Sequence, residues 1–321
     1  MKPTSMLAAA GVLCAGLTAA ALAQDYPTRP VQVLVGFPAG GSADIVGRYV
    51  MQKMAEVTGN PFVIENRTGA GGNMAFAATA AAKPDGYTLL FSTPGIAINP
   101  SLYKKVSFTI EDFTPIALIG EAPLVLLANS KLPIKSIRDL VDAGRQKPDA
   151  IRFASSGNGS SSHLAMDYLR HMTGMQYLHI PYRGGGPALI DLMSGQVDVT
   201  MLPISESMPY VRDGRVLALG QTGAKRSPIA PNIPTIEEAG VKGYSSFTWY
   251  MVLGPANLPP AVVNFIQTQL SRVLKTPELQ EKLQAAGVGV VNGDAQEARA
   301  FLQAEYRKWA ALIKASGTII E

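Results

Sequence analysis

The sequence predicts an α/β protein of two lobes with a ligand cleft between them. Short apolar strands alternate with helix-like segments, and this pattern occurs twice, around residues 25–120 and 125–225. Strand–loop–helix repetition is typical of a largely parallel sheet covered by helices. The chain has 321 residues. About 300 residues remain after an N-terminal leader, which is enough for two domains.

The first repeat opens with an apolar strand at residues 31–35, followed by a Gly-rich turn at residues 36–41. A helix is expected after this turn, with Ser42 as its N-cap. Gly-rich or Pro-containing turns also separate the remaining elements of the repeat. Its expected strands are residues 31–35, 62–65 and 87–91, and its expected helices are residues 42–54 and 73–82.

The second repeat follows the same pattern with shorter strands. Its expected strands are residues 123–129, 151–154, 177–180, 197–201 and 216–220, and its helices are residues 136–147, 161–172 and a segment ending at 194. Pro and Gly cluster at residues 228–243, which predicts a long irregular connection. A strand at residues 249–253 and amphipathic helices at residues 260–275 and 296–316 complete the chain.

The C-terminal helices decide the domain organisation. The simplest arrangement returns them to the first lobe, so that the chain crosses between lobes twice. Lobe 1 is then discontinuous, residues 24–124 and 229–321, and lobe 2 is residues 125–228.

The N-terminal segment indicates export. Lys2 is the only charge before Asp25, and an apolar stretch at residues 6–22 leads to Ala21-Leu-Ala23. A small-x-small end of this kind is what signal peptidase reads, so residues 1–23 are expected to be a cleaved signal peptide and the protein periplasmic. An uncleaved membrane anchor is the alternative, because the apolar run is close to spanning length. A lipid anchor on Cys14 would require a small residue before it, where Leu13 stands.

Composition excludes several classes of protein. Cys14 is the only cysteine, so the chain without residues 1–23 has no disulfide and no Cys-based metal site. Lys and Arg number 28 against 24 Asp and Glu, a net charge of +4, with no basic block of the kind that binds nucleic acid. The slight positive balance modestly favours anionic ligands.

The sequence lacks the motifs of common enzymes. It has no Gly-x-Ser-x-Gly elbow, His-Glu-x-x-His zinc motif or Gly-Lys-Ser/Thr phosphate loop. Its histidines, His163, His171 and His179, are spaced by eight residues, which does not stack ligands on a helix, so structural roles are expected. We therefore expect no catalysis, no cofactor and no metal. A hydrolase is the competing hypothesis, and it would require turnover of an ester or amide.

Three loops carry the chemistry: residues 36–44, 155–163 and 182–186. Each follows a strand and opens a helix, the position at which open α/β sheets bind ligands. Helix N-termini there present unpaired N–H groups and partial positive charge, and Gly permits close approach, so a carboxylate or phosphate fits best. The alternative is that Gly and Ser only shape the turns.

A series of stretches runs almost from end to end of the chain, in a specific order and spacing. They are residues 26–30, 36–44, 65–72, 84–89, 153–165, 180–184, 195–198 and 233–240, together with Trp309. Through these stretches the chain resembles the substrate-binding proteins of tripartite tricarboxylate transporters, the Bug (Bordetella uptake gene) or TctC-like family.

The resemblance implies a type II periplasmic binding protein fold, a small carboxylate ligand and a two-part membrane permease as partner. It implies capture of a di- or tricarboxylate, amino acid or aromatic acid by a monomer whose cleft closes on it. Ligand sensing by an orphan member that signals to a sensor partner is the alternative. The ligand-binding residues implied by the resemblance are Ala39, Gly40, Gly41, Ser42, Asp44, Ser92, Thr93, Ser155, Ser156, Asn158, Ser161, His163, Tyr182, Arg183 and Gly184.

The sequence allows two roles for Asp44 and two for Arg183. Asp44 is a carboxylate beside an expected anion site, so it either stabilises the first helix turn or accepts a hydrogen bond from a ligand amine or a bridging water. Arg183 either pairs with a second ligand carboxylate or stays solvated. Which carboxylate is bound is left open by the sequence.

Overall fold

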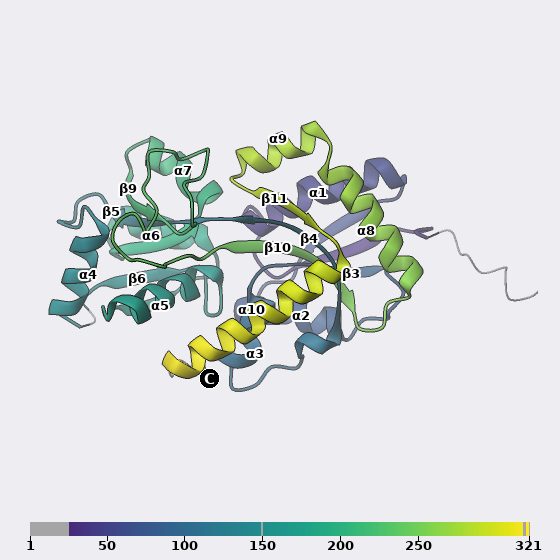
Figure 1. Cartoon of the computed structure of the whole chain (residues 1–321), viewed down its shortest axis with the longest axis horizontal. Coiled ribbons are helices and arrows are strands. Elements are labelled where there is room, and N and C mark those ends of the chain that lie inside the picture. The colour runs from purple at the N-terminus through teal and green to yellow at the C-terminus, as the bar shows by residue number, and fades with distance from the viewer. Residues whose placement is uncertain (1–25, 149, 317–318, 321) are drawn as a thin grey trace, which may run out of the picture.

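The computed structural model describes residues 26–148, 150–316 and 319–320. The predicted signal peptide, residues 1–23, lies outside the described residues. Two α/β lobes lie side by side along the long axis of the molecule (Figure 1). Within the described ranges, no helix is both long enough and apolar enough to cross a membrane.

The first lobe is built on a six-stranded sheet in the order β11-β4-β10-β3-β1-β2. Its strands come from both ends of the described chain. They are β1 (Val31–Val35), β2 (Phe62–Asn66), β3 (Thr88–Ser92), β4 (Phe113–Ala122), β10 (Thr248–Pro255) and β11 (Gly289–Gly293). The helices of this lobe are α1 (Ser42–Thr58), α2 (Asn73–Ala80), α3 (Gly95–Leu102), α8 (Pro260–Leu274), α9 (Pro277–Ala285) and α10 (Ala295–Ser316).

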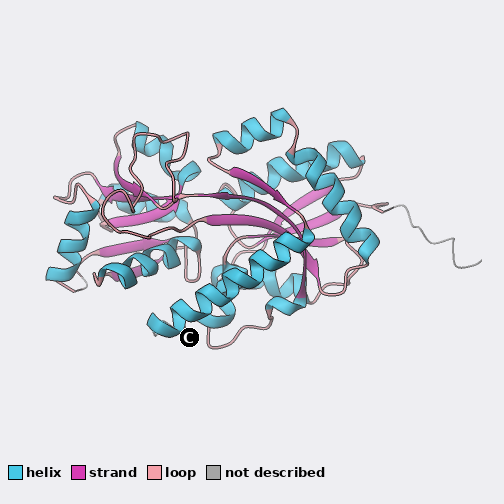
Figure 2. Ribbon diagram, in the orientation of Figure 1, coloured by secondary structure: helices cyan, strands magenta, loops and turns pink. Residues whose placement is uncertain are grey.

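Apolar residues on alternate faces of these strands bury both sides of the sheet. Val33 and Leu89 pack with α1, α8 and α9 on one face, whereas Leu34 and Leu90 pack with α2, α3 and α10 on the other. Successive side chains of a strand point to opposite faces, so strands that are apolar throughout need helices on both sides. Figure 2 shows these two helical layers around the sheet.

The second lobe repeats this architecture around a five-stranded sheet in the order β7-β6-β8-β5-β9. Its strands are β5 (Leu124–Asn129), β6 (Arg152–Ser155), β7 (Leu178–Pro181), β8 (Val199–Pro203) and β9 (Val216–Gln221). Its helices are α4 (Ile137–Gln146), α5 (Ser161–Thr173), α6 (Gly185–Ser194) and α7 (Ile204–Arg212). Helices α4 and α5 cover one face and α6 and α7 the other.

The sheets are mixed, so the expectation of a largely parallel sheet was wrong. Strands β1, β2 and β3 pair in parallel, as do β6, β7 and β8. Strand β10 runs antiparallel to β3 and β4, and β5 runs antiparallel to β8 and β9. The strands that carry the chain across between the lobes, β5 and β10, enter their sheets from the opposite direction to the βαβ units. Strands β4 and β11 and helices α3, α7 and α9 were not expected from the sequence.

The chain crosses between lobes at Pro123 and again before β10. The irregular segment 222–247 packs on the second sheet: Ile236 and Tyr244 join its core, and the Tyr244 hydroxyl donates to the Ala165 carbonyl at 2.8 Å. We therefore propose that lobe 2 extends from about residue 124 to about residue 247, which moves the second crossing beyond residue 228. Helix α10 adds a further contact between the lobes, because Trp309 packs with Leu164 of α5.

Candidate functional site

A cavity of about 390 Å³ lies between the two lobes, at the ends of strands from both sheets. The first lobe contributes the β1–α1 loop and Thr93, which follows β3. The second lobe contributes the loops that follow β6, β7 and β8. The residues that line the cavity are Phe37–Ala43, Ile45, Thr93, Ser156, Ser160, Ser161, Arg183–Pro187, Leu189, Pro203, Ser205, Glu206, Pro209, Tyr210 and Thr248.

A second cavity of about 530 Å³ adjoins the first. The two share Phe37 and Pro38 from the first lobe and Ser156, Arg183 and Gly184 from the second. The second cavity also contacts the glycine-rich segment 68–72 of the first lobe. The two cavities therefore form one interlobe cleft, divided where Pro38 approaches Gly184.

Helices begin at this cleft from both lobes. Helix α1 begins after Gly41 and α6 after Gly184, and neither N-cap has a side chain that accepts from the first turn. Gly41, not the predicted Ser42, is the N-cap of α1. Helix α5 is capped by Ser160, whose hydroxyl accepts from the His163 N–H at 3.3 Å. The first-turn N–H groups and the helix dipoles that meet here make the cleft favourable for an anion.

The structure brings most of the predicted site residues to the cleft. Nine line the smaller cavity: Ala39, Gly40, Gly41, Ser42, Thr93, Ser156, Ser161, Arg183 and Gly184. Asn158 and Tyr182 line the larger cavity. The Tyr182 hydroxyl donates to Asp191 Oδ2 at 2.6 Å, which ties this loop residue to the following helix, α6. Asp44, Ser92, Ser155 and His163 lie behind the cavity walls, and each is buried.

Asp44 faces away from the cleft and supports the β1–α1 loop. Its carboxylate accepts from the Gly40 N–H at 3.0 Å, from Arg48 Nε at 2.9 Å and from Asn66 Nδ2 at 2.9 Å. Burial alone would raise the pKa of Asp44, but these hydrogen bonds lower it below its usual range. This geometry supports the first of its two interpretations, a structural role in the first turn of α1.

Replacing Asp44 with alanine should therefore destabilise the protein by about 2 kcal/mol, because three donors, one of them charged, lose their buried acceptor. Urea unfolding followed by circular dichroism measures this loss. Asp213→Ala is the matched control, since Asp213 is exposed and its side chain makes no hydrogen bond found in the described chain. Equal unfolding midpoints for the two variants would contradict the structural role.

A buried histidine pair supports the β6–α5 loop. The His163 and His179 rings stack at a centroid distance of 4.1 Å and an interplanar angle of 6°. His179 Nε2 hydrogen-bonds the Ser155 hydroxyl at 2.7 Å, and His163 Nδ1 accepts from the Gly159 N–H at 3.3 Å. Burial lowers the pKa of His163 to about 4 and that of His179 to about 3. Both rings are thus neutral at neutral pH and shape the loop from behind.

Glu206 is the charged residue of the described cavity wall that sequence reasoning missed. It lies in the first turn of α7, a helix that was not expected, directly after the expected strand at residues 197–201. Its Oε1 accepts from the Ser42 N–H of the opposite lobe at 2.8 Å. Burial raises the pKa of Glu206, and the hydrogen bonds from Ser42 oppose that rise. Its place after a strand, as in the three loops already chosen, was the signal that could have found it.

The lobes also meet at the far side of the cleft. The Tyr103 hydroxyl of the first lobe donates to the Asn158 carbonyl at 3.2 Å. A Cβ on Gly71 would lie only 2.1 Å from the same carbonyl oxygen. Gly71 has a φ of 64° and therefore also occupies the left-handed region. This glycine permits backbone contact between the lobes beside the larger cavity.

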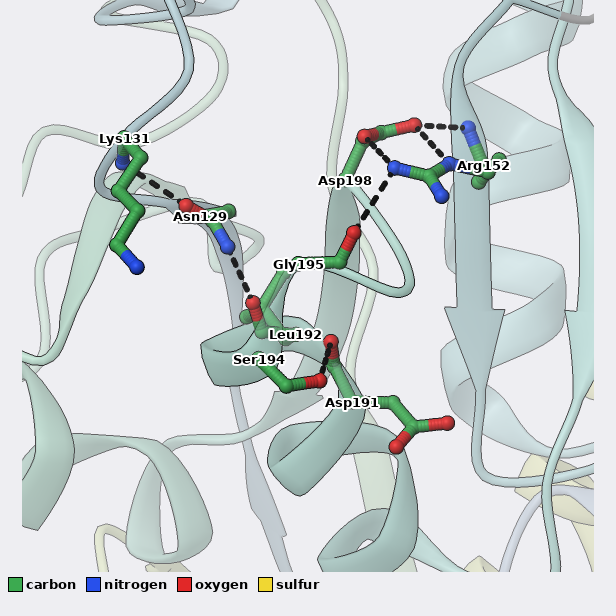
Figure 3. Close-up of polar contacts among 8 residues, drawn as sticks. All are labelled: Asn129, Lys131, Arg152, Asp191, Leu192, Ser194, Gly195 and Asp198. Atoms are coloured by element: carbon green, nitrogen blue, oxygen red, sulfur yellow. Dashed lines mark hydrogen bonds and ion pairs between the residues drawn. The ribbon is translucent and has the colours of Figure 1, made fainter.

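A polar network holds α6 in place from its C-terminal end (Figure 3). Arg152 Nη2 bonds Asp198 Oδ1 at 2.7 Å and the Gly195 carbonyl at 3.1 Å. Asn129 Nδ2 donates to the Leu192 carbonyl at 2.6 Å. The stretch 195–198, one of those that carried the family resemblance, thus anchors α6 to β5, β6 and β8. The N-terminus of α6 lies at the cleft, at the opposite end of the helix from this network.

Two α/β lobes, two crossings between them and a polar cleft at their strand ends define a ligand-binding protein of the periplasmic binding protein type. Residues 46–318 match the family model described as tripartite tricarboxylate transporter family receptor, TctC. The chain is 32% identical to protein BugT of Bordetella pertussis over 325 residues, which cover 99% of each chain. It is 33% identical over 309 residues to a Pseudomonas sp. strain P51 protein from the tcbD–tcbE intergenic region, covering 95% of this chain and 92% of that one.

Solved structures agree with this result. The Rpa4515 protein of R. palustris with adipate superposes with a TM-score of 0.86 at 34% identity, covering 91% of this chain and 98% of that one. MatC of Rhodopseudomonas palustris with bound malate superposes with a TM-score of 0.84 at 31% identity, covering 90% and 100%. This chain belongs to the tripartite tricarboxylate transporter receptor family. The predicted family and the predicted two-lobed type II fold are confirmed.

Proposed function

We propose that this chain is a periplasmic solute-binding protein that captures a small carboxylate between its lobes and delivers it to a two-part permease of the tripartite tricarboxylate type. It does so as a monomer, by binding without catalysis, after residues 1–23 are removed. The observation that carries the proposal is that three helices begin at one cavity, α1 from the first lobe and α5 and α6 from the second.

The cavity wall supports an anion that is held without a permanent strong salt bridge. Hydroxyl groups of Ser42, Thr93, Ser156 and Ser161 surround the helix N-termini, and Arg183 is the one basic side chain among the described lining residues. Neutral donors are desolvated at lower cost than charged ones. A site of this kind binds a carboxylate and releases it when the lobes separate, which suits delivery to a permease.

A thermal-shift panel of mono-, di- and tricarboxylates, amino acids and aromatic acids tests this proposal on residues 24–321. A ligand at about a hundredfold its dissociation constant should stabilise the protein by roughly 2.7 kcal/mol and raise its melting temperature by several degrees. Ser156→Ala should reduce the shift, whereas Ser130→Ala, at an exposed position outside the lining, should leave it unchanged. A folded protein that responds to no member of the panel would refute carboxylate capture.

A further inference from the structure

The cleft contains a carboxylate of its own. Glu206 is the one acidic side chain among the described residues that line the smaller cavity. It extends from α7 of the second lobe to the N-terminus of α1 in the first, where its Oε1 accepts from the Ser42 N–H at 2.8 Å. The protein itself therefore already supplies an anion for α1.

The surrounding backbone leaves room for this carboxylate. A Cβ on Gly185, the first residue of α6, would lie 2.0 Å from Glu206 Oε2, so only glycine fits there without displacing Glu206. A Cβ on Gly41 would lie 3.7 Å from Oε1. The Glu206 carboxylate thus lies between the first turns of α1 and α6, in contact with both lobes.

Glu206 has no cationic partner among the described residues: no Lys, Arg or His nitrogen there forms an ion pair with it. An ionised carboxylate in a partly dehydrated cavity favours an opposite charge beside it and disfavours a second carboxylate. The donors left to a ligand are those of α5 and α6, the hydroxyls of Thr93, Ser156 and Ser161, and the guanidinium of Arg183.

We propose that Glu206 makes this cleft selective for a carboxylic acid that also carries a protonated amine. The ligand carboxylate is held at the N-termini of α5 and α6, and the ligand ammonium donates to Glu206. This inference rests on the proposed carboxylate-binding function and narrows its ligand class. Plain dicarboxylates are disfavoured, because their second carboxylate meets that of Glu206.

Matched ligands test this selectivity by calorimetry at pH 7.5 and constant ionic strength. The amino series runs from glycine to 6-aminohexanoate, and each member is compared with the dicarboxylate of equal carbon number, from oxalate to adipate. At the length that binds best, the amino acid should bind about tenfold more tightly than its dicarboxylate, or better. Glu206→Gln keeps a carbonyl acceptor for the Ser42 N–H but removes the charge, and should abolish that preference.

Glu281→Gln is the control, because it removes the same charge from an exposed position outside the cavity lining. Circular dichroism and thermal unfolding establish that each variant is folded. A preference for dicarboxylates that is equal in the native protein and Glu206→Gln would overturn the role of Glu206 while carboxylate capture stands. An amino-acid preference that survives in Glu206→Gln would also overturn it. Failure of both series to bind either protein would overturn the role of Glu206, and the thermal-shift panel with tricarboxylates and aromatic acids would then decide whether carboxylate capture stands.

Discussion

Replacing Gly71 with alanine should weaken binding of the best carboxylate of the panel by at least about tenfold. The added Cβ would lie 2.1 Å from the Asn158 carbonyl oxygen of the opposite lobe. A clash with backbone cannot be relieved by a side-chain rotation, so the lobes must stay further apart. A ligand that needs donors from both lobes then loses some of them, and about 1.4 kcal/mol corresponds to a tenfold loss.

The variant also carries a local backbone cost of about 1–2 kcal/mol, because alanine is unfavourable at a φ of 64°. Gly59→Ala separates the two effects: its φ is 69°, and nothing lies within 4 Å of an added Cβ. Small-angle scattering of the ligand-free proteins should show a larger radius of gyration for Gly71→Ala only. Unchanged affinity together with an unchanged radius would show that this contact does not govern how closely the lobes approach.

The protein should lose stability as the pH falls from 6.5 towards 4, because of the buried histidine pair. The unfolded chain binds a proton at each histidine near pH 6.5, whereas burial lowers the pKa of His163 to about 4 in the folded state. The unfolded state therefore binds more protons in this window, and acid favours it. The contribution of neutral His163 to the free energy of unfolding is fully present above the pKa of the unfolded chain. By pH 5 about 2 kcal/mol of it is lost.

Protonation also has a structural consequence at the site. A proton on His163 Nδ1 would remove the acceptor of the Gly159 N–H, and two charged rings stacked 4.1 Å apart would repel each other. The β6–α5 loop should therefore loosen, and ligand binding should weaken, in the same pH range.

Melting temperatures measured from pH 7 to pH 4.5 test the role of the pair. His163→Asn keeps a local acceptor but cannot take up a proton, so its melting temperature should fall less steeply than that of the native protein. His171→Asn is the control, since His171 is exposed on the same helix. If melting temperature falls equally with pH in the native protein and in His163→Asn, protonation of His163 is not the cause of the acid destabilisation.

Local pattern predicted the elements of the βαβ units well. Residues 31–35 and 161–172 were expected as a strand and a helix, and the structure has β1 at Val31–Val35 and α5 at Ser161–Thr173. These segments combine apolar periodicity with turn residues at their ends, which are local signals. Strand direction is not local, since it depends on where the chain enters the other lobe. The antiparallel direction of β5 and β10 could therefore not be predicted from the sequence pattern.

For the candidate site, too, the sequence predicted the local elements but not the features that depend on the folded chain. Gly-rich and Ser-rich loops after strands are visible in the sequence, and the β1–α1, β6–α5 and β7–α6 loops do converge on one cleft. Which side chain of a loop faces the cavity depends on its backbone turns. Asp44 and His163 were therefore included among the predicted ligand-binding residues, although each is 3% exposed and faces the interior.

By itself, the sequence determined the fold class, the family and the class of loop that forms the cleft, because periodicity, glycine spacing and motif order are written along the chain. Only the tertiary structure decided that Glu206 of one lobe meets Ser42 of the other and that Gly71 lies against Asn158. These pairs are 164 and 87 residues apart in the chain. Contacts of this kind follow from how two folded lobes pack together, which no local propensity encodes.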